Sequence, residues 1–144
     1  MLIKGIRISD GEDILSVKII DILNLISNKN NLNWMILFLN GMPNPGKGLY
    51  LSEYRYKINQ KNGTFINLED LLLLSDIFFQ IYEMVLIGDQ NVNRLHRYDS
   101  DEEMYELCEI VIELIDCAFW EVHTKDLALI NLIENNFKKI ELLF

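Results

Sequence analysis

EIVIELIDCAFWEVHT, residues 109–124, reads as two antiparallel strands joined by a turn. The run 110–115 is rich in β-branched and aliphatic residues on both faces of the pleat, which is typical of a strand covered on both sides. Phe119, Trp120 and Val122 carry the signal of a second strand. The turn falls near Asp116 and contains no glycine. We expect this hairpin at the centre of a sheet.

The rest of the last third predicts a helix and a closing strand. A helix should begin near Asp126 and end near Lys138 and Lys139, and its apolar stripe consists of Leu127, Ile130, Ile133 and Phe137. Residues 140–144 then alternate as a strand, with Ile140, Leu142 and Phe144 on one face.

The N-terminal half predicts shorter elements. Residues 2–8 alternate as a strand, and Ser9 with Glu12 has the capping-box spacing that opens a helix, which should run to about Ser27. Strands are expected at 34–39, 49–58 and 64–66, the last after the Asn62-Gly63 turn. Asn67 can cap a short helix through Leu74.

Two further elements complete the expected fold. Residues 77–87 allow helix or strand, and we favour a strand with one face formed by Ile77, Phe79, Ile81, Val85 and Ile87. A second capping box at Ser100 should start a helix with Met104, Leu107 and Cys108 facing inward. The fold class is therefore α+β: a single domain over residues 1–144 with one mixed, mostly antiparallel sheet and three to four helices. The first and last helices should be the main covering ones.

Charge is distributed unevenly along the chain. Nine of the 22 acidic residues fall between Tyr98 and Thr124, a segment without Lys or Arg, and the remaining 13 equal the 13 basic residues. This segment therefore accounts for the whole formal charge of −9. Nucleic acid is an unsuitable ligand for such a surface, since its binding needs cationic contacts to phosphate. A cationic protein is the complementary partner.

No feature predicts membrane insertion or export. Lys4 and Arg7 interrupt the apolar residues at the start, and no run reaches the length of about 18 apolar residues that a membrane span needs. We expect a cytoplasmic protein without a membrane partner. The sequence leaves the oligomeric state open.

The segment Gly41–Gly48 imitates a phosphate-binding loop. It has the Gly-x-x-x-x-Gly-Lys frame, but Gly48 has no hydroxyl for Mg²⁺, and Pro43 and Pro45 have no N–H to donate to phosphate. We interpret it as a turn and expect no nucleotide and no other cofactor.

Metal-binding patterns are also incomplete. Asp99-Ser100-Asp101 begins like a calcium loop, but Met104 and Ile110 stand where Gly and Glu are required. His96, Cys108, Cys117 and His123 lack the short spacings of a zinc site, and the strand between the two cysteines keeps them too far apart for a disulfide.

Catalytic patterns are weak as well. His123 with Asp116 or Glu121 and a serine forms a triad only on paper, because no nucleophile signature is present. Glu113, alone in an apolar strand, is a candidate carboxylate with a raised pKa. The favoured interpretation is an edge-strand Glu or one paired with a base. No catalytic residue is expected.

The segment EEMYELCEIVIELIDCAFWEVHTKD, residues 102–126, resembles a family of small uncharacterised proteins of low-GC Gram-positive bacteria, as do Lys4-Gly5-Ile6 and Asn33-Trp34. In that family a Cys ends a short helix, and an aromatic strand ends in Lys-Asp. The small, acidic profile is similar to that of immunity proteins that neutralise toxins delivered between bacteria. The resemblance implies no particular functional residues.

These observations favour a non-catalytic binding protein, an immunity-type inhibitor whose acidic surface covers a cationic, nuclease-like toxin domain. The expected docking residues lie at the start of the second capped helix: Asp99, Asp101, Glu102, Glu103, Tyr105 and Glu106. The alternatives are a small ligand-binding or enzymatic domain whose site is assembled from dispersed residues, and a structural interaction module.

Overall fold

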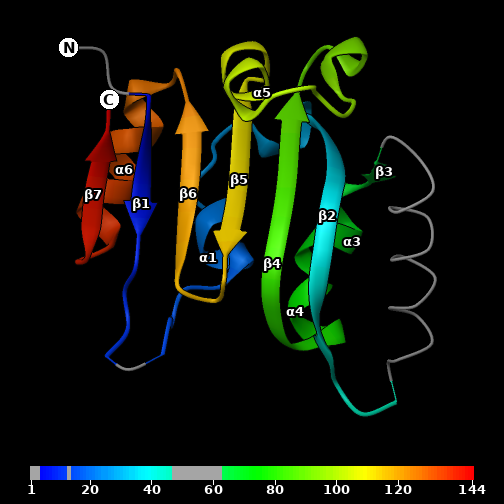
Figure 1. Ribbon diagram of the computed structural model, residues 1–144, viewed down its shortest axis with the longest axis vertical. Coiled ribbons are helices and arrows are strands. Elements are labelled where there is room, and N and C mark those ends of the chain that lie inside the picture. Colours follow the sequence, from blue (N-terminus) through cyan, green and yellow to red (C-terminus); the bar gives the residue numbers. More distant parts are fainter. Residues whose placement is uncertain (1–3, 13, 47–62) are drawn as a thin grey trace.

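One seven-stranded antiparallel sheet forms the framework of the computed structural model, which describes residues 4–12, 14–46 and 63–144. The strand order is β3-β2-β4-β5-β6-β1-β7 (Figure 1). The strands are β1 Gly5–Ile8, β2 Asn33–Pro43, β3 Thr64–Ile66, β4 Phe78–Asp89, β5 Ile110–Ile115, β6 Phe119–Thr124 and β7 Ile140–Leu143. Each of the six pairings in this part of the chain is antiparallel, so the expected mixed sheet is corrected to an antiparallel one.

The predicted hairpin lies at the centre of the sheet. β5 is the fourth of the seven strands and pairs with β4 and β6, with Ile112 opposite Leu86 and Val122. Its turn is formed by Asp116 and Cys117, which have φ values of 50° and 58°. Asp tolerates this left-handed region better than most side chains do, which accounts for the first of these two positions but not for Cys117.

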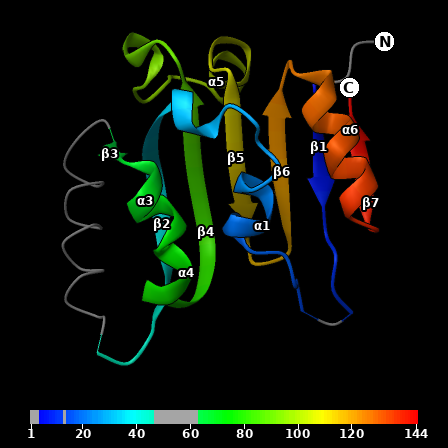
Figure 2. The same ribbon diagram turned by 180° about the vertical axis from the view of Figure 1, so that it is seen from behind.

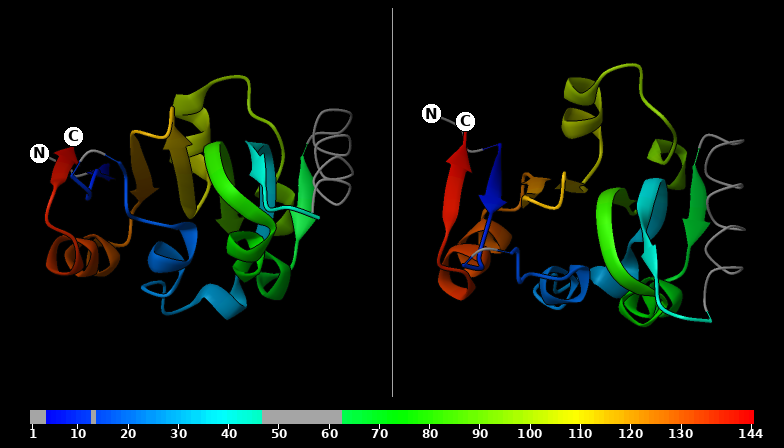
Figure 3. Two further views of the ribbon diagram at one scale, coloured as in Figure 1. Left: turned by 90° about the horizontal axis from the view of Figure 1, so that it is seen from below. Right: turned by 60° about the horizontal axis from the view of Figure 1, so that its bottom comes forward.

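Helices cover the two faces of the sheet unequally (Figure 2 and Figure 3). One face carries α1 Ile19–Leu23, α3 Leu68–Leu72, α4 Leu74–Ile77 and α6 Leu127–Asn136, and we call it the helix-covered face. The other face carries α5 Asp101–Leu107 and the 3₁₀ turn Val92–Arg94, both at one end of the strands (Figure 1). The described residues thus form five α-helices, rather than the three or four expected.

Two apolar clusters correspond to the two faces. The larger lies between the sheet and the helix-covered face and includes Trp34, Ile112, Trp120 and Ile133. The smaller lies under α5 and consists of Met35, Leu37, Ile87, Leu95, Met104, Cys108 and Val111. β5 contributes to both clusters, which confirms that it is covered on both sides.

The long first helix predicted from Ser9 to Ser27 is wrong. Within that range only Ile19–Leu23 is α-helical, and residues 9–12 and 14–18 form a loop without helical structure. The carboxylate of Asp10 accepts hydrogen bonds from the backbone N–H groups of Lys138 (2.9 Å) and Lys139 (2.6 Å) before β7. A contact distant in sequence therefore replaces the local capping box.

The predicted strand at 77–87 exists, but its residues do not share one face. Register shifts in the β2–β4 pairing change the alternation along β4. As a result Ile81 packs against the larger cluster, whereas Ile87 belongs to the smaller one. Bulges of this kind cannot be seen in the hydrophobic pattern of a single strand.

The other three predicted helix starts are confirmed, but some residues predicted to face inward do not. The side chains of Asn67, Ser100 and Asp126 cap α3, α5 and α6. Leu107 and Leu127, predicted to face inward, are 46% and 53% exposed. The strand predicted at 49–58 and the end of the Gly41–Gly48 segment lie outside the described residues, while Gly41–Pro43 belongs to β2.

Candidate functional site

The nine acidic residues of the segment 98–124 gather on the α5 side of the sheet or at its ends. Ile112, Leu114, Trp120 and Val122 point to the helix-covered face. Strand side chains alternate, so Glu113 and Glu121 point to the opposite side, beneath α5. Asp99, Asp101, Glu102, Glu103 and Glu106 lie on or just before α5, Glu109 follows it, and Asp116 lies in the hairpin turn.

The residues expected to dock a partner lie where the capped helix places them. Ser100 accepts a hydrogen bond from the backbone N–H of Glu103 at 3.2 Å, and the buried Met104 fixes α5 on the sheet. Asp99, Asp101, Glu102, Glu103 and Glu106 are exposed. The first-turn acids suit the positive end of a helix, so local physics explains part of this cluster.

Tyr105 differs from these acidic neighbours. It is half-buried, and its ring stacks on the imidazole of His123 with centroids 3.7 Å apart and planes 8° apart. Tyr98 is also engaged internally, since its hydroxyl donates to the Arg94 carbonyl at 2.6 Å. Both rings are therefore held by contacts within the protein, and Tyr105 is only partly accessible to a partner.

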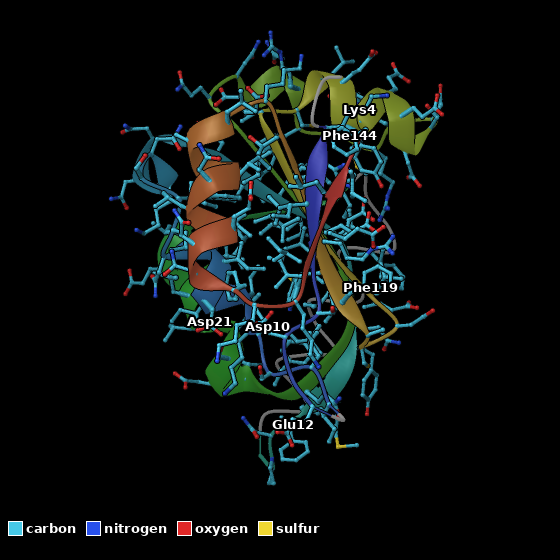
Figure 4. All side chains as sticks on the ribbon, turned by 90° about the vertical axis from the view of Figure 1, so that its left-hand side faces the viewer. Lys4, Asp10, Glu12, Asp21, Phe119 and Phe144 are labelled. Atoms are coloured by element: carbon cyan, nitrogen blue, oxygen red, sulfur yellow. The ribbon has the colours of Figure 1, made fainter. Side chains whose placement is uncertain are left out.

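An ion-pair network crosses β6, β1 and β7 below α5. Arg7 donates to Glu121 at 2.7 Å and lies 3.5 Å from Glu141. The other oxygen of Glu121 lies 3.1 Å from Nε2 of His123. The guanidinium of Arg7 also lies 4.1 Å from the centroid of the Phe119 ring. Figure 4 shows Phe119 on the side of the sheet away from α6.

Glu113 and His123 are buried beside this network. Burial raises the pKa of Glu113, and a hydrogen bond from the Tyr105 hydroxyl offsets this only in part. Burial lowers the pKa of His123, against the influence of Glu121. In the part of the chain that the structure describes, Oε1 of Glu113 and Nδ1 of His123 are buried without a hydrogen-bond partner.

The preferred expectation for Glu113 is thereby corrected. β5 is a central strand, and the residue directly opposite Glu113 on β6 is another acid, Glu121. Both carboxylates are buried, but Glu121 is paired with Arg7, whereas the ion pairs of the described residues include none to Glu113; burial then favours the protonated form of Glu113. The alternative interpretation, a Glu113 carboxylate with a raised pKa, is therefore the better one. The feature of the sequence that pointed to it was a single Glu in a strand that is apolar on both faces.

The structure brings together part of the possible triad and none of the possible zinc site. His123 contacts Glu121, whereas Asp116 lies at the far end of the hairpin and interacts with Glu83. Burial raises the pKa of the Cys108 thiol, so this cysteine is not an activated nucleophile. Among the described residues no group of His, Cys, Asp and Glu is arranged to hold a metal ion.

The cross-strand partners of Arg7 were not predicted from the sequence. Arg7 lies opposite Glu121 and Glu141, on strands more than a hundred residues away along the chain. The sequence showed only that each of these three charged residues lies in a segment predicted to be a strand. Pairing such charges requires the strand order, which periodicity does not contain.

Among the described residues, a partly exposed apolar strip lies next to the network. Phe38 pairs with Val85, Val85 with Glu113, and Ile115 with Phe119 in the sheet register. Phe38 is exposed, Val85, Ile115 and Phe119 are half-buried, and Val85 also packs against the smaller cluster. We call this strip and the exposed acids of the α5 region together the acidic face.

Comparison with known proteins adds no relative. No family model, no curated protein and no solved structure matches the chain. No helix in the described residues is long and apolar enough to cross a membrane. The chain's own geometry is therefore the basis of the functional argument.

Proposed function

We propose that the protein is a non-catalytic binding protein, an immunity-type inhibitor that docks a cationic toxin domain on its acidic face. The observation that carries the proposal is the position of the acidic segment: the exposed acids of α5 lie on the same side of the sheet as the partly exposed apolar strip. An apolar centre with a charged rim is the usual anatomy of a protein interface.

Electrostatics supports a cationic partner. Five exposed acids lie on or beside α5, and the segment 98–124 supplies no Lys or Arg to neutralise them. Repulsion among these groups is relieved when a basic surface approaches, and the same field accelerates the encounter. Toxin domains that act on nucleic acid need a basic surface of this kind.

The buried groups under α5 favour a structural role over chemistry. His123 is stacked under Tyr105 and paired with Glu121, and Glu121 is occupied by Arg7. A general acid or base needs hydrogen-bond access to its substrate. We therefore assign this network to holding α5 in place on the sheet.

The experiment tests binding to the product of the adjacent gene, because immunity genes lie next to the gene of their toxin. Asp101, Glu102 and Glu106 are changed together to Lys, and the fold is checked by circular dichroism. We expect the association rate to fall at least tenfold at low salt and to lose most of its salt dependence. Growth protection against the toxin should be lost in parallel.

A matched control changes three exposed acids outside the acidic face, Glu12, Glu69 and Asp76, to Lys. It alters the net charge equally and should leave binding within about threefold. Equal losses in both triple variants would show that net charge alone matters. Unchanged rates in the α5 variant would exclude the acidic face as the interface.

A further inference from the structure

A pocket of about 340 Å³ lies on the helix-covered face, away from the acidic face. Its walls are the loop before α1, the end of α4 and the start of β4, and Leu114 and Trp120 of the central hairpin form its floor. Figure 2 shows α1 and α4 on this same face of the sheet. The volume lies within the range of about 300–1,000 Å³ that is usual for small-molecule sites.

The interior of the pocket is apolar. Its buried lining residues are Val17, Ile19, Phe78, Leu114 and Trp120. The single N–H of the Trp120 ring donates to the Val17 carbonyl at 2.8 Å, so it is not available to a ligand. The interior therefore favours a hydrocarbon chain or ring over a polar group.

The rim carries the two most exposed large apolar side chains of the described residues. Ile14 is 74% exposed and Phe79 is 70% exposed, and both line the pocket. Single exposed apolar residues are common on protein surfaces, but a pair at the mouth of an apolar pocket extends its contact surface outward. Ile14 and Phe79 could therefore contact the part of a bound ligand that lies at the opening of the pocket.

One charge lies at the opening. Lys18 is exposed and is the single charged side chain among the described residues that line the pocket, with Ser16, Ser75 and Gln80 as polar neighbours. In a chain of net charge −9, a cation at the mouth of an apolar pocket selects an anionic head group locally.

The wall that carries Lys18 is held in place from both sides. Ser16 donates from its backbone N–H and its hydroxyl to the Asp10 carbonyl, at 2.8 and 3.1 Å. Asp10 itself is held by the backbone before β7, and Val17 is held by Trp120. The pocket is therefore preformed, which reduces the ordering cost of binding.

From these features we infer that the pocket binds a small amphipathic anion, with its hydrocarbon part against Trp120 and its carboxylate or similar head group at Lys18. This site is separate from the proposed docking surface and does not depend on it. No covalent step is involved.

Two native cysteines provide the test. Cys117 lines the pocket and is half-buried, whereas Cys108 lies on the other side of the sheet and does not line it. Decanoate at millimolar concentration should slow alkylation of Cys117 at least fivefold relative to Cys108, as read by peptide mass spectrometry. In a Trp34→Phe variant, the emission of Trp120 should shift with the same apparent Kd.

Variants then locate the two ends of the ligand. Ser75→Phe narrows the opening and should weaken decanoate binding at least tenfold. Lys18→Gln should weaken it roughly two- to fivefold, the range of an exposed ion pair. The control Lys138→Gln removes a surface lysine that does not line the pocket and should have no effect.

Three outcomes would overturn the inference. The first is unchanged Cys117 reactivity in the native chain, a measurement that needs no variant to fold. The second is equal protection of both cysteines, because that indicates general stabilisation or a detergent effect. The third is equal affinity for decanoate and decyltrimethylammonium, because Lys18 should discriminate between the two head groups.

Discussion

At the scale of single residues, burial determines the properties of Glu113 and His123. Each lies on a central strand under α5, and each has one buried atom without a partner among the described residues. Their pKa values move in opposite directions, Glu113 upward and His123 downward, and both shifts favour the neutral form. The two groups should therefore have opposite effects on the pH dependence of stability.

The wild-type protein should lose stability as the pH rises because Glu113 is buried, and the Glu113→Gln variant should not show this loss. The unfolded carboxyl ionises near pH 4.3, while the folded one retains its proton to a higher pH, so the native state binds more protons in that interval. The free energy of unfolding thus falls from the unfolded pKa up to the folded one. Urea melts from pH 4 to 8 should show a flatter profile for Glu113→Gln, with the variant gaining stability relative to the wild type at neutral pH.

The control is Glu69→Gln, at an exposed position on α3. It should leave the shape of the profile unchanged. A Glu113→Gln profile parallel to the wild type would contradict the raised pKa.

His123 should have the opposite effect, on the acidic side. Its folded pKa is lowered, so below about pH 6.5 the unfolded imidazole binds a proton that the folded one does not. The free energy of unfolding falls as the pH drops from there toward the folded pKa. His123→Phe keeps an aromatic ring against Tyr105 and should abolish this part of the profile. His96→Phe, at an exposed position, should retain it.

At the scale of elements, contacts distant in sequence decide where the sequence-based prediction succeeds. The central hairpin and the capped starts of α3, α5 and α6 were predictable because their signals are local. The loop after β1 was not, because Asp10 binds the backbone before β7, 128 residues away. Leu107 and Leu127 are exposed for a similar reason: periodicity predicts which residues form an apolar stripe on a helix, but not which of them contact the sheet.

The site was predictable only in part, for the same reason. The exposed acids follow from a local cap and a charge count. The stacking of Tyr105 on His123 and the pairing of Arg7 with Glu121 depend on strand order. The pocket depends on a loop that the capping-box pattern predicted to be helical.

Removing the Asp10 carboxylate should destabilise the N-terminal loop and β7 together. Asp10→Ala leaves the N–H groups of Lys138 and Lys139 without their acceptor, which should cost about 1–3 kcal/mol, as for hydrogen bonds to a charged group. Asp10→Asn retains an acceptor and should cost less. Figure 4 shows Asp10 beside the end of α6.

Glu12→Ala, in the same loop and exposed, is the control and should be neutral within about 0.5 kcal/mol in urea melts. A neutral Asp10→Ala would mean that the loop is held by its other contacts. Hydrogen exchange at Lys138 and Lys139 would then remain slow in the variant.

At the scale of the whole molecule, the net charge is concentrated in one segment of the sequence. The segment 98–124 accounts for the net charge of −9, with five exposed acids on or beside α5, while the rest of the chain is formally balanced. Such a distribution makes the folded state repel itself locally, and salt should relieve this because the Debye length falls to about 10 Å at 0.1 M. The urea midpoint at pH 7 should therefore rise with added NaCl.

Two neutralising variants separate local repulsion from net charge. Asp101→Asn, Glu102→Gln and Glu106→Gln together remove three charges from α5, and Glu12→Gln, Glu69→Gln and Asp76→Asn together remove three from elsewhere. Both sets remove three negative charges and bring the formal charge from −9 to −6.

If repulsion among the acids of α5 is the cause, the α5 set should reduce the salt dependence of the urea midpoint to about half or less, and the other set should leave it nearly unchanged. The α5 set also removes Asp101 and Glu102 from the first turn of α5, where an acid is worth about 0.3–1 kcal/mol at the helix N-terminus, so its stability at high salt should fall. If the urea midpoint depends equally on salt in the two variants, the total charge controls stability, and its position on α5 does not. Relief of repulsion at α5 would then no longer be a reason for a cationic partner to bind there.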